Sequence, residues 1–462
     1  MRSSLSINSR IVILVCLSCL FFMAQRFWLN HANRIINRMG SSRWRRGCRG
    51  LVIAILGFVI VSFVDRIFLR NFPRSGLVSW AMGLSQLWLF ASSMAYLAVK
   101  LVNALEWFWG LLPQPRVPVL VPAAAGGCNA PLHSSPRNHG ARPGPRGMGS
   151  RGRAGVDAGL GDAPEDAGRR KLFQYAAMTA ACIPFGASIY GFASERLHYT
   201  VQRVELPIHH LPAPLDGLRI VQLSDIHIGD FMPREEVRRA VAMANELEAD
   251  VAMLTGDYVT GSRDPLEDCA AELGQLRAPL GIWACNGNHE IYAGVEDETA
   301  AVFLRHGMRL LRQQNVELQW RGAKFNLIGV DYQKEFAGLR ARAQMLPEVE
   351  SLMRRDIPNI LLAHNPNSFP KAAELGIELS LAGHTHGGQI QIEIVDHRWS
   401  PARFMTSYVA GLYQLPMASV VAGPGAAATK ACLYVNRGLG TIGIPARFGV
   451  KPEISLLTLR SA

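Results

Sequence analysis

Two features are scarce in this sequence: a repeating pattern of cysteines, and acidic residues in its first 194 positions. Eight cysteines occur in 462 residues without repeated Cys-x-x-Cys spacing, which argues against a structural zinc–cysteine site. From residue 195 onward there are three of them, Cys269, Cys285 and Cys432. This odd number argues against a disulfide framework, although it leaves one pair open.

The shortage of acidic residues divides the chain into two parts of opposite charge. Residues 1–194 contain 22 Lys and Arg against 6 Asp and Glu, a net charge of +16, whereas residues 195–462 contain 26 against 30, a net charge of −4. A nucleic-acid-binding domain is usually basic, so we expect no nucleic-acid partner for the second part. Basic residues beside apolar segments instead indicate the orientation of a membrane protein.

Four apolar stretches lie in the basic part, at residues 11–24, 51–64, 76–99 and 172–193. The third and fourth contain 24 and 22 residues without a charge, which is enough for a helix to span a bilayer, and Pro184 is compatible with such a helix. The first two are shorter and span only if their charged ends reach the interface. Their alternatives are a buried helix or a signal-like segment.

The charges between these stretches predict an orientation. Six arginines lie between residues 34 and 49, and eight basic residues lie between 137 and 171. Both segments are expected in the cytoplasm. With four spans, the N-terminus and the part after residue 194 then lie outside. We therefore expect a multi-pass cell-membrane protein with an extracytoplasmic C-terminal domain. Arg169-Arg170 also resembles a twin-arginine export signal, but a plain signal anchor is preferred.

Composition sets the domain boundaries. Residues 112–171 are rich in Pro, Gly, Ala and Arg, which predicts a disordered cytoplasmic linker. The chain then divides into a membrane region with three transmembrane helices at 1–111, this linker, a fourth transmembrane helix or signal anchor at 172–194, and a folded domain at 195–462.

Within that last domain, short apolar runs that end in polar residues predict buried strands, at 219–223, 251–254, 282–285, 360–363 and 379–382. Residues 234–247 have helical spacing between the first two. Residues 317–321 and 324–330 flank a turn with a glycine and predict a hairpin. Strands that alternate with helices before hairpins predict an α/β domain with a mixed sheet.

Metal-binding residue types follow these strands. They occur in Ser-Asp-Ile-His, Thr-Gly-Asp-Tyr, Gly-Asn-His-Glu, Leu-Leu-Ala-His and Gly-His-Thr-His-Gly-Gly, as Asp225, His227, Asp257, Asn288, His289, His364, His384 and His386. Loops at the carboxyl ends of strands converge on one edge of a sheet, so we expect these side chains to meet. Flanking glycines such as Gly256 and Gly383 allow tight turns there.

The chemistry of the set predicts the metal. Carboxylate, imidazole and amide ligands without thiolate suit Mn, Fe, Zn or Co. Seven such ligands exceed the needs of one tetrahedral ion and suit two divalent ions, with Asp257 shared between them. The spacing of two residues in Asp225/His227 and His384/His386 keeps each pair close together.

Each motif alone also has an ordinary explanation as a turn or cap, and His364 has the weakest support because a single buried histidine is often only packed. The joint occurrence favours metal binding. Asp230 and Glu290 lie beside the motifs and are either partners that orient ligands or solvated charges. The remaining histidines of this domain without such context are interpreted as surface residues: His209, His210, His306 and His397.

At these residues the chain resembles the calcineurin-like metallophosphoesterase superfamily, and within it the membrane-associated bacterial phosphodiesterases. The resemblance covers residues 218–459 and includes the ending at 434–448. It implies a four-layer α/β/β/α sandwich, with Asp225, His227, Asp257 and His386 on one metal and Asp257, Asn288, His364 and His384 on the other. His289 is implied as a general acid beside the phosphate rather than a ligand. Family members usually have Asp where Glu290 stands.

We therefore expect residues 195–462 to be a metal-dependent phosphoester hydrolase that uses a metal-bridging hydroxide. A phosphodiester is the preferred substrate and a phosphomonoester the alternative. The membrane anchor favours an envelope or lipid-linked phosphoester. A non-catalytic membrane sensor or scaffold is a competing interpretation, and the charge of −4 makes a nuclease less favoured.

Overall fold

A computed structural model describes residues 7–68, 76–111, 167–261, 264–333, 345–394, 397–404, 406–417 and 429–462. Residues 112–166 of the predicted linker lie outside these ranges, while residues 167–171 belong to a helix. Contacts between residues divide the chain into two units, Met1–Ala98 with Ala180–Ala462, and Val99–Thr179. The domain boundaries inferred from composition stay a prediction.

The basic part of the chain forms long helices: α1 (Ile7–Asn37), α2 (Ser42–Phe68), α3 (Gly76–Leu111) and α4 (Ala167–Ala193). Among the described residues, three segments are long and apolar enough to cross a membrane, namely Ser42–Val64, Gly76–Leu111 and Gly168–Leu197. These contain the second, third and fourth predicted spans. The first, residues 11–24, lies in α1 but partly outside the residues whose side chains are described.

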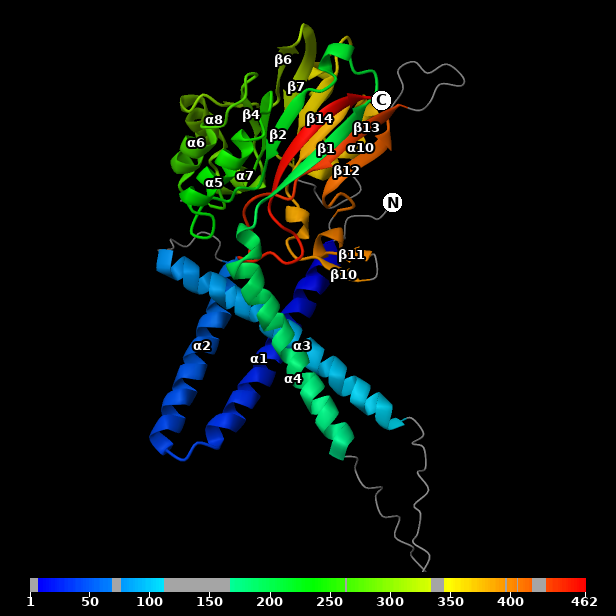
Figure 1. Ribbon diagram of the computed structural model, residues 1–462. Coiled ribbons are helices and arrows are strands. Elements are labelled where there is room, and N and C mark those ends of the chain that lie inside the picture. The colour runs from blue at the N-terminus through cyan, green and yellow to red at the C-terminus, as the bar shows by residue number, and fades with distance from the viewer. Residues whose placement is uncertain are drawn as a thin grey trace, which may run out of the picture. The chain divides into compact units, whose positions relative to one another are not determined.

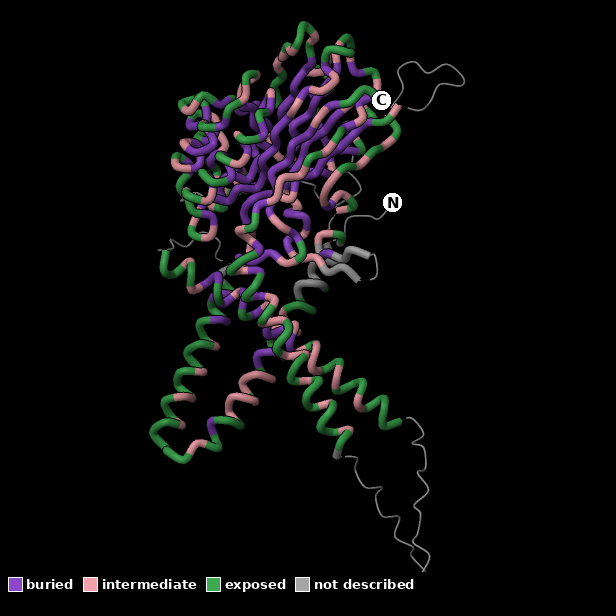
Figure 2. The backbone as a smooth tube through the Cα atoms, viewed as in Figure 1, coloured by how far each residue is buried: buried purple, intermediate pink, exposed green. Residues whose placement is uncertain are grey.

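The surface of these helices suits lipid. On α2, Leu51 and Ile53 are 61% and 64% exposed, and Figure 2 shows long exposed stretches along α1 to α4. Polar side chains of α1 and α3 pair with each other: Gln25 Nε2 of α1 donates to Ser92 Oγ of α3 at 2.9 Å. Trp88 Nε1 donates to Gln25 Oε1 at 3.1 Å. Such pairing is required where no water is present to replace it.

Two six-stranded sheets form the C-terminal domain (Figure 1). The first has the order β1 (Thr200–Ile208), β14 (Glu453–Ser461), β2 (Arg219–Leu223), β3 (Val251–Thr255), β4 (Ile282–Cys285) and β5 (Arg309–Leu310). The second has the order β12 (Gly411–Pro416), β13 (Lys430–Val435), β9 (Leu379–Ala382), β8 (Asn359–Leu362), β7 (Ala323–Gly329) and β6 (Gln314–Trp320). A separate ribbon pairs β10 (Ile392–Ile394) with β11 (His397–Trp399).

The sheets are mixed. In the first, β2 to β5 are parallel, and β14 runs antiparallel to β2 but parallel to β1. In the second, β7, β8, β9 and β13 are parallel. Antiparallel strands close both edges of the second sheet, through β6 with β7 and β12 with β13. The predicted hairpin is therefore confirmed, with Trp320 opposite Ala323.

Helices cover the outer faces of both sheets. The first sheet is covered by α5 (Arg234–Asn245), α6 (Leu266–Leu273) and α8 (Glu296–Arg305), whose Val237, Cys269 and Phe303 share a buried cluster with Val221 and Leu254 (Figure 1). On the second sheet, α9 (Val349–Leu352) and α10 (Phe369–Leu375) contribute to two further clusters. The inner faces pack against each other through residues such as Ile220, Met253, Phe325 and Ile360. The expected four-layer α/β/β/α sandwich is confirmed.

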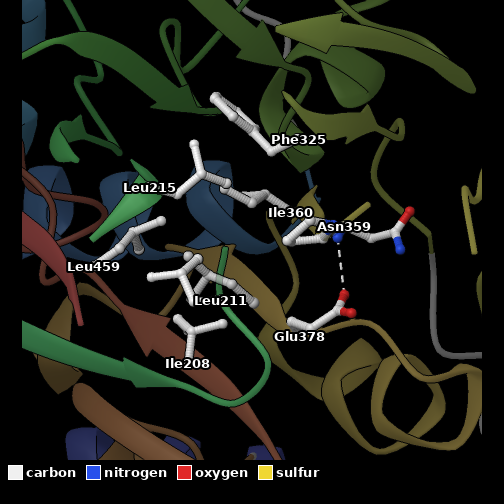
Figure 3. A pocket seen from close by; sticks show the side chains of 10 residues that line it. Ile208, Leu211, Leu215, Phe325, Asn359, Ile360, Glu378 and Leu459 are labelled. Carbon is white, nitrogen blue, oxygen red and sulfur yellow. Dashed lines mark hydrogen bonds between the residues drawn. The ribbon is translucent and has the colours of Figure 1, made fainter. Parts of the chain in front are cut away.

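A small apolar pocket lies between the two sheets. Figure 3 shows Ile208, Leu215 and Leu459 opposite Phe325 and Ile360. At its edge, the Asn359 backbone N–H donates to Glu378 Oε2 at 2.8 Å. The lining contains none of the candidate metal ligands. This pocket is therefore an incompletely filled part of the core and takes no part in the chemistry below.

Candidate metal centre

The candidate ligands follow the carboxyl ends of parallel strands from both sheets. Asp225 comes two residues after β2, and Asp257 comes two residues after β3. Asn288 begins the short helix α7 (Asn288–Ala293) just after β4. His364 and His384 come two residues after β8 and β9. Because the two sheets stack, both sets of strand ends deliver side chains to one place.

Asp225, His227 and His386 form the first ligand group, since their ligand atoms lie within 4.8 Å of one another. The Nε2 atoms of His227 and His386 are 3.2 Å apart, and His386 Nε2 lies 3.3 Å from Asp225 Oδ1. Burial lowers the pKa of His227 to about 3 and lowers that of His386 as well. Both imidazoles are therefore neutral, which is the form that binds metals.

Asp257, His364 and His384 form the second ligand group by the same distance criterion. His364 Nε2 lies 3.1 Å from Asp257 Oδ2, and the rings of His364 and His384 are 5.1 Å apart. The same Asp257 oxygen lies 3.5 Å from His227 Nε2. Asp257 thus stands between the two groups, where a shared ligand would have to lie.

A cation is the natural partner for one buried polar atom of the site. Asn288 Oδ1 is buried and has no hydrogen-bond partner among the described residues. Buried oxygen atoms without a donor are rare and costly. Together with two carboxylates and four imidazoles, this amide oxygen fits a site for divalent cations with oxygen and nitrogen ligands. The residues present therefore fit the group that the sequence predicts.

Backbone conformation brings these side chains together. Asp225, His227, Asp257, His384 and His386 all have left-handed φ values between 50° and 74°, which non-glycine residues adopt rarely and at a cost. A Cβ atom at Gly287 would collide with the Asp257 carboxylate, and one at Gly383 would collide with the Asp225 carboxylate. These two glycines are required so that neighbouring turns can approach the ligands closely.

Glu290 holds the turn that carries Asp257. Its buried carboxylate accepts hydrogen bonds from the backbone N–H groups of Gly287 (2.7 Å), Asp257 (2.9 Å), Tyr258 (2.7 Å) and Val259 (3.2 Å). Burial, with repulsion from Asp257, raises the pKa of Glu290 to about 7. Glu290 therefore positions backbone groups rather than histidine rings. Asp230, the other suggested partner, is exposed.

His289 is partly exposed at the edge of the site. Its backbone N–H donates to Asp257 Oδ1 at 2.9 Å, and its ring lies 4.7 Å from that of His227. Nδ1 lies 3.0 Å from the carbonyl oxygen of Thr260, so Nδ1 carries the proton and donates it to that oxygen. Nε2 is then the ring nitrogen left to face a substrate.

Two tyrosines that the motif analysis missed stand beside the ligands. The ring of Tyr332 lies 5.4 Å from that of His384 and 6.1 Å from that of His364. Tyr332 and His364 also line one pocket. The ring of Tyr292 lies 5.9 Å from that of His289. Tyr292 lies one helical turn after His289 in α7. This spacing was the one feature of the sequence that could have predicted a tyrosine beside His289.

Of the histidines interpreted as surface residues, the three whose side chains are described do not join the centre. His210 is exposed, His209 is partly exposed, and His306 pairs with Glu267 at 2.8 Å. The side chain of His397 lies outside the described residues. Cys269, Cys285 and Cys432 are buried and free, so the pairing left open for them does not occur.

Known proteins share this site-bearing region. Residues 218–388 match the family model described as calcineurin-like phosphoesterase. These residues form a calcineurin-like phosphoesterase domain. The family of the domain is one of phosphoester hydrolases, and it confirms the resemblance drawn from the motifs.

Relatives of the calcineurin-like domain occur in bacteria and animals. The chain is 33% identical over 285 residues to a Bos taurus transmembrane protein with metallophosphoesterase domain. It is 28% identical to the uncharacterized metallophosphoesterase YkuE of Bacillus subtilis, over 62% of this chain and 95% of that one, and 28% identical to the phosphodiesterase YaeI of Escherichia coli, over 63% and 98%. It spans 60% of the length of the Bos taurus protein and of its Danio rerio counterpart.

The chain is also similar to the solved structure of a Haemophilus influenzae NAD nucleotidase. The aligned region includes 48% of this chain and 45% of the nucleotidase chain, with 15% sequence identity and a TM-score of 0.31. This likeness is too distant to carry any statement about activity. The names of the Bos taurus and Danio rerio relatives include the word transmembrane. This agrees with the apolar helices that precede the calcineurin-like domain here.

Proposed function

We propose that this protein is a dinuclear, metal-dependent phosphodiesterase. Asp225, His227, Asp257 and His386 would hold one divalent ion, and Asp257, Asn288, His364 and His384 would hold the other. The position of the Asp257 carboxylate, 3.5 Å from His227 and 3.1 Å from His364, supports this proposal most strongly. Bound Mn, Fe, Zn or Co ions would neutralise phosphate oxygens and supply an acidified water as nucleophile.

The chain's own residues supply the remaining chemistry. The Thr260 carbonyl accepts from His289 Nδ1–H, so in the imidazolium form of His289 the second proton lies on Nε2. Nε2 would give this proton to the leaving-group oxygen and leave the neutral ring with its proton on Nδ1. Such general acid catalysis contributes about 10²- to 10⁴-fold. Glu290 and the left-handed turns hold the ligands in place before substrate arrives. This fixed arrangement favours catalysis because little reorganisation is required during the reaction.

The preference for diesters over monoesters is supported by the Escherichia coli relative, whose printed name is phosphodiesterase. Tyr292 beside His289 and Tyr332 beside His364 and His384 would each contact one substituent of a diester. A phosphomonoester is the second candidate substrate.

We also propose that the chain is a multi-pass cell-membrane protein whose catalytic domain, residues 195–462, lies on the extracytoplasmic side. The basic residues at 34–49 and 137–171, which precede the second and fourth predicted spans, support this orientation. Tethering at a membrane raises the effective concentration of substrates in that membrane, so an envelope or lipid-linked phosphoester is the preferred class. Reporter fusions at the C-terminus test the sidedness, and a reporter active only in the cytoplasm would contradict it.

Metal analysis and hydrolysis measurements on the full-length protein in detergent test the activity. We expect two ions per chain and metal-dependent hydrolysis of bis(p-nitrophenyl) phosphate, faster than that of p-nitrophenyl phosphate. Asp257→Asn should lose both ions and the activity together, whereas Asp331→Asn, in an ion pair with Arg312, should keep them. Metal binding without hydrolysis of either ester would favour the sensor or scaffold instead.

A further inference from the structure

We propose that Arg447 is a positioning residue for the first ligand group, acting through the backbone loop 437–440. Arg447 lies in the segment between β13 and β14, far along the sequence from the ligands that it would position. The inference rests on the proposed function because its consequence is a change in metal affinity at one of the two ion sites.

The side chain of Arg447 is fully buried, and the hydrogen bonds of its guanidinium group among the described residues all go to backbone carbonyls. Nη2 donates to Gly438 and to Arg437 at 3.0 Å each, and Nε donates to Gly440 at 3.2 Å. Nη1 has no hydrogen-bond partner within the described part of the chain. A buried guanidinium group is costly. Its hydrogen bonds hold the carbonyl groups of Arg437, Gly438 and Gly440 around one positive charge.

The loop held by Arg447 lies directly against Asp225. Gly440 N–H donates to the carbonyl oxygen of Asp225 at 2.8 Å, and Leu439 N–H donates to that of Ser224 at 3.0 Å. A Cβ atom at Gly438 would come within 2.6 Å of the Cβ of Asp225. Because Asp225 has a left-handed φ of 51°, its carboxylate direction depends on neighbours that hold the backbone in this rarely adopted conformation.

The same segment reaches the loop that carries His386. Gln389 Nε2 donates to the carbonyl oxygen of Ile444 at 2.6 Å. In return, Ile442 N–H donates to Gln389 Oε1 at 2.9 Å, and Phe448 N–H donates to the Gln389 carbonyl at 3.0 Å. The segment 437–448 therefore ties together the two loops that supply Asp225 and His386. The turn carrying Asp257 also accepts hydrogen bonds from the Asp225 turn, at Gly256 from Asp225 N–H (2.9 Å) and at Asp257 from His227 N–H (3.0 Å). Glu290 holds this turn from another side.

This arrangement predicts a larger effect on the ion of the first ligand group than on the other ion. Loss of the guanidinium group should loosen Asp225 and His386 most. His384, whose N–H donates to the Asp225 carboxylate at 3.0 Å, should be affected less, through Asp225. Changes to groups that hold metal ligands weaken metal affinity by about 10- to 100-fold. A residue that only filled the core would instead lower the stability of the metal-free protein without distinguishing between the ions.

The test uses the full-length protein in detergent and the variants Arg447→Gln and Arg447→Lys. Mn²⁺ bound after dialysis is counted, and its affinity is measured by titrating the thermal unfolding of the metal-free protein. We expect two ions in the unaltered protein. In Arg447→Gln the affinity of the more weakly bound Mn²⁺ should fall by about 10- to 100-fold, with a smaller change for the other ion. Arg447→Lys should show a smaller shift. Excess Mn²⁺ should restore kcat.

Asn359→Ala is the matched control, because Asn359 is also buried and bonds the loop carbonyls of Arg354 (2.7 Å) and Ile357 (3.3 Å) at the start of β8. It should lower the unfolding temperature without changing either Mn²⁺ affinity. If Arg447→Gln does not fold, Gly438→Ala, which pushes on Asp225, is expected to weaken the same ion. Retention of both ions at unaltered affinity in the folded variants would overturn the inference. Failure of the unaltered protein to bind Mn²⁺ would overturn the proposed function instead.

Discussion

Nε2 of His364 lies 3.1 Å from Oδ2 of Asp257, and both side chains are buried. Burial alone would lower the pKa of His364, but the carboxylates of Asp257 and Asp225 raise it to about 10. Without metal, the raised pKa favours a protonated His364 beside these carboxylates. Divalent cations would compete with this proton for the same groups.

The metal-free protein should consequently lose stability as the pH rises from 6.5 to about 10. The folded state binds the proton more tightly than the unfolded state, whose His364 has the ordinary pKa of 6.5. The stabilisation is therefore complete below pH 6.5 and is lost as the pH passes the folded value. Thermal unfolding in EDTA measures this trend, with a fall of about 2–4 °C for each kcal/mol lost.

His364→Gln should flatten this decline, whereas the partly exposed His306→Gln should not change it. In the presence of Mn²⁺ the trend should reverse, because metal affinity rises as His364 releases its proton. If the stability of the metal-free protein depended on pH in the same way in both variants, the raised pKa would not belong to His364.

Glu290→Gln should destabilise the metal-free protein by about 1–3 kcal/mol. The carboxylate accepts hydrogen bonds from four backbone N–H groups, and the amide nitrogen of glutamine would face two of these donors without accepting from them. It should also weaken both ions, since Glu290 holds the shared ligand Asp257. Urea unfolding and Mn²⁺ titration measure the two effects. Glu290→Asp keeps a carboxylate and should lie between the two, and Glu272→Gln, in a partly exposed ion pair, should leave the Mn²⁺ affinities unchanged.

Much of the fold and of the metal centre follows from local patterns in the sequence. The predicted strands 219–223, 282–285 and 379–382 coincide with β2, β4 and β9, and the helix predicted at 234–247 corresponds to α5 (Arg234–Asn245). Short apolar runs define buried strands locally, and the convergence of strand ends then brings the ligands together.

Other features depend on contacts between distant residues, and local patterns do not encode them. Strand β1 pairs in parallel with β14, Thr200 opposite Glu453, and neither the polar sequence of β1 nor its neighbours predicts that partner. Arg447 has the sequence character of a surface arginine, yet it is fully buried behind Asp225. Tyr332 follows β7 beside Asp331 but belongs to none of the five motifs with metal-binding residue types. The pairing of β1, the burial of Arg447 and the position of Tyr332 can be recognised only from the three-dimensional structure.

His289→Ala should lower kcat by about 10²- to 10⁴-fold while both ions stay bound. The loss should be larger for a diester with an alkyl leaving group than for one with a p-nitrophenolate leaving group, because a poor leaving group depends more on protonation by Nε2. Metal counts on the same preparation serve as the control. Equal losses for both leaving groups, or no loss, would show that His289 does not act as the acid.

The two tyrosines provide a test of which side of the site each half of a diester occupies. Tyr292 stands beside His289, where the proposed general acid meets the leaving group, whereas Tyr332 stands beside His364 and His384. In an in-line displacement the leaving group is apical and the substituent that stays on the phosphate is equatorial, so the two point in different directions. We expect the retained substituent to lie against Tyr332. A monoester has no such substituent.

Tyr332→Ala should therefore raise KM for bis(p-nitrophenyl) phosphate by about tenfold, or about 1.4 kcal/mol, and change KM for p-nitrophenyl phosphate little. Tyr292→Ala should raise KM for both esters, since both keep the aryl leaving group beside His289. Steady-state kinetics with each pair of ester and variant measure this pattern, and unchanged Mn²⁺ content confirms that the ligands are intact. An equal effect of Tyr332→Ala on the two esters would place the retained substituent elsewhere and remove the structural basis for a diester preference.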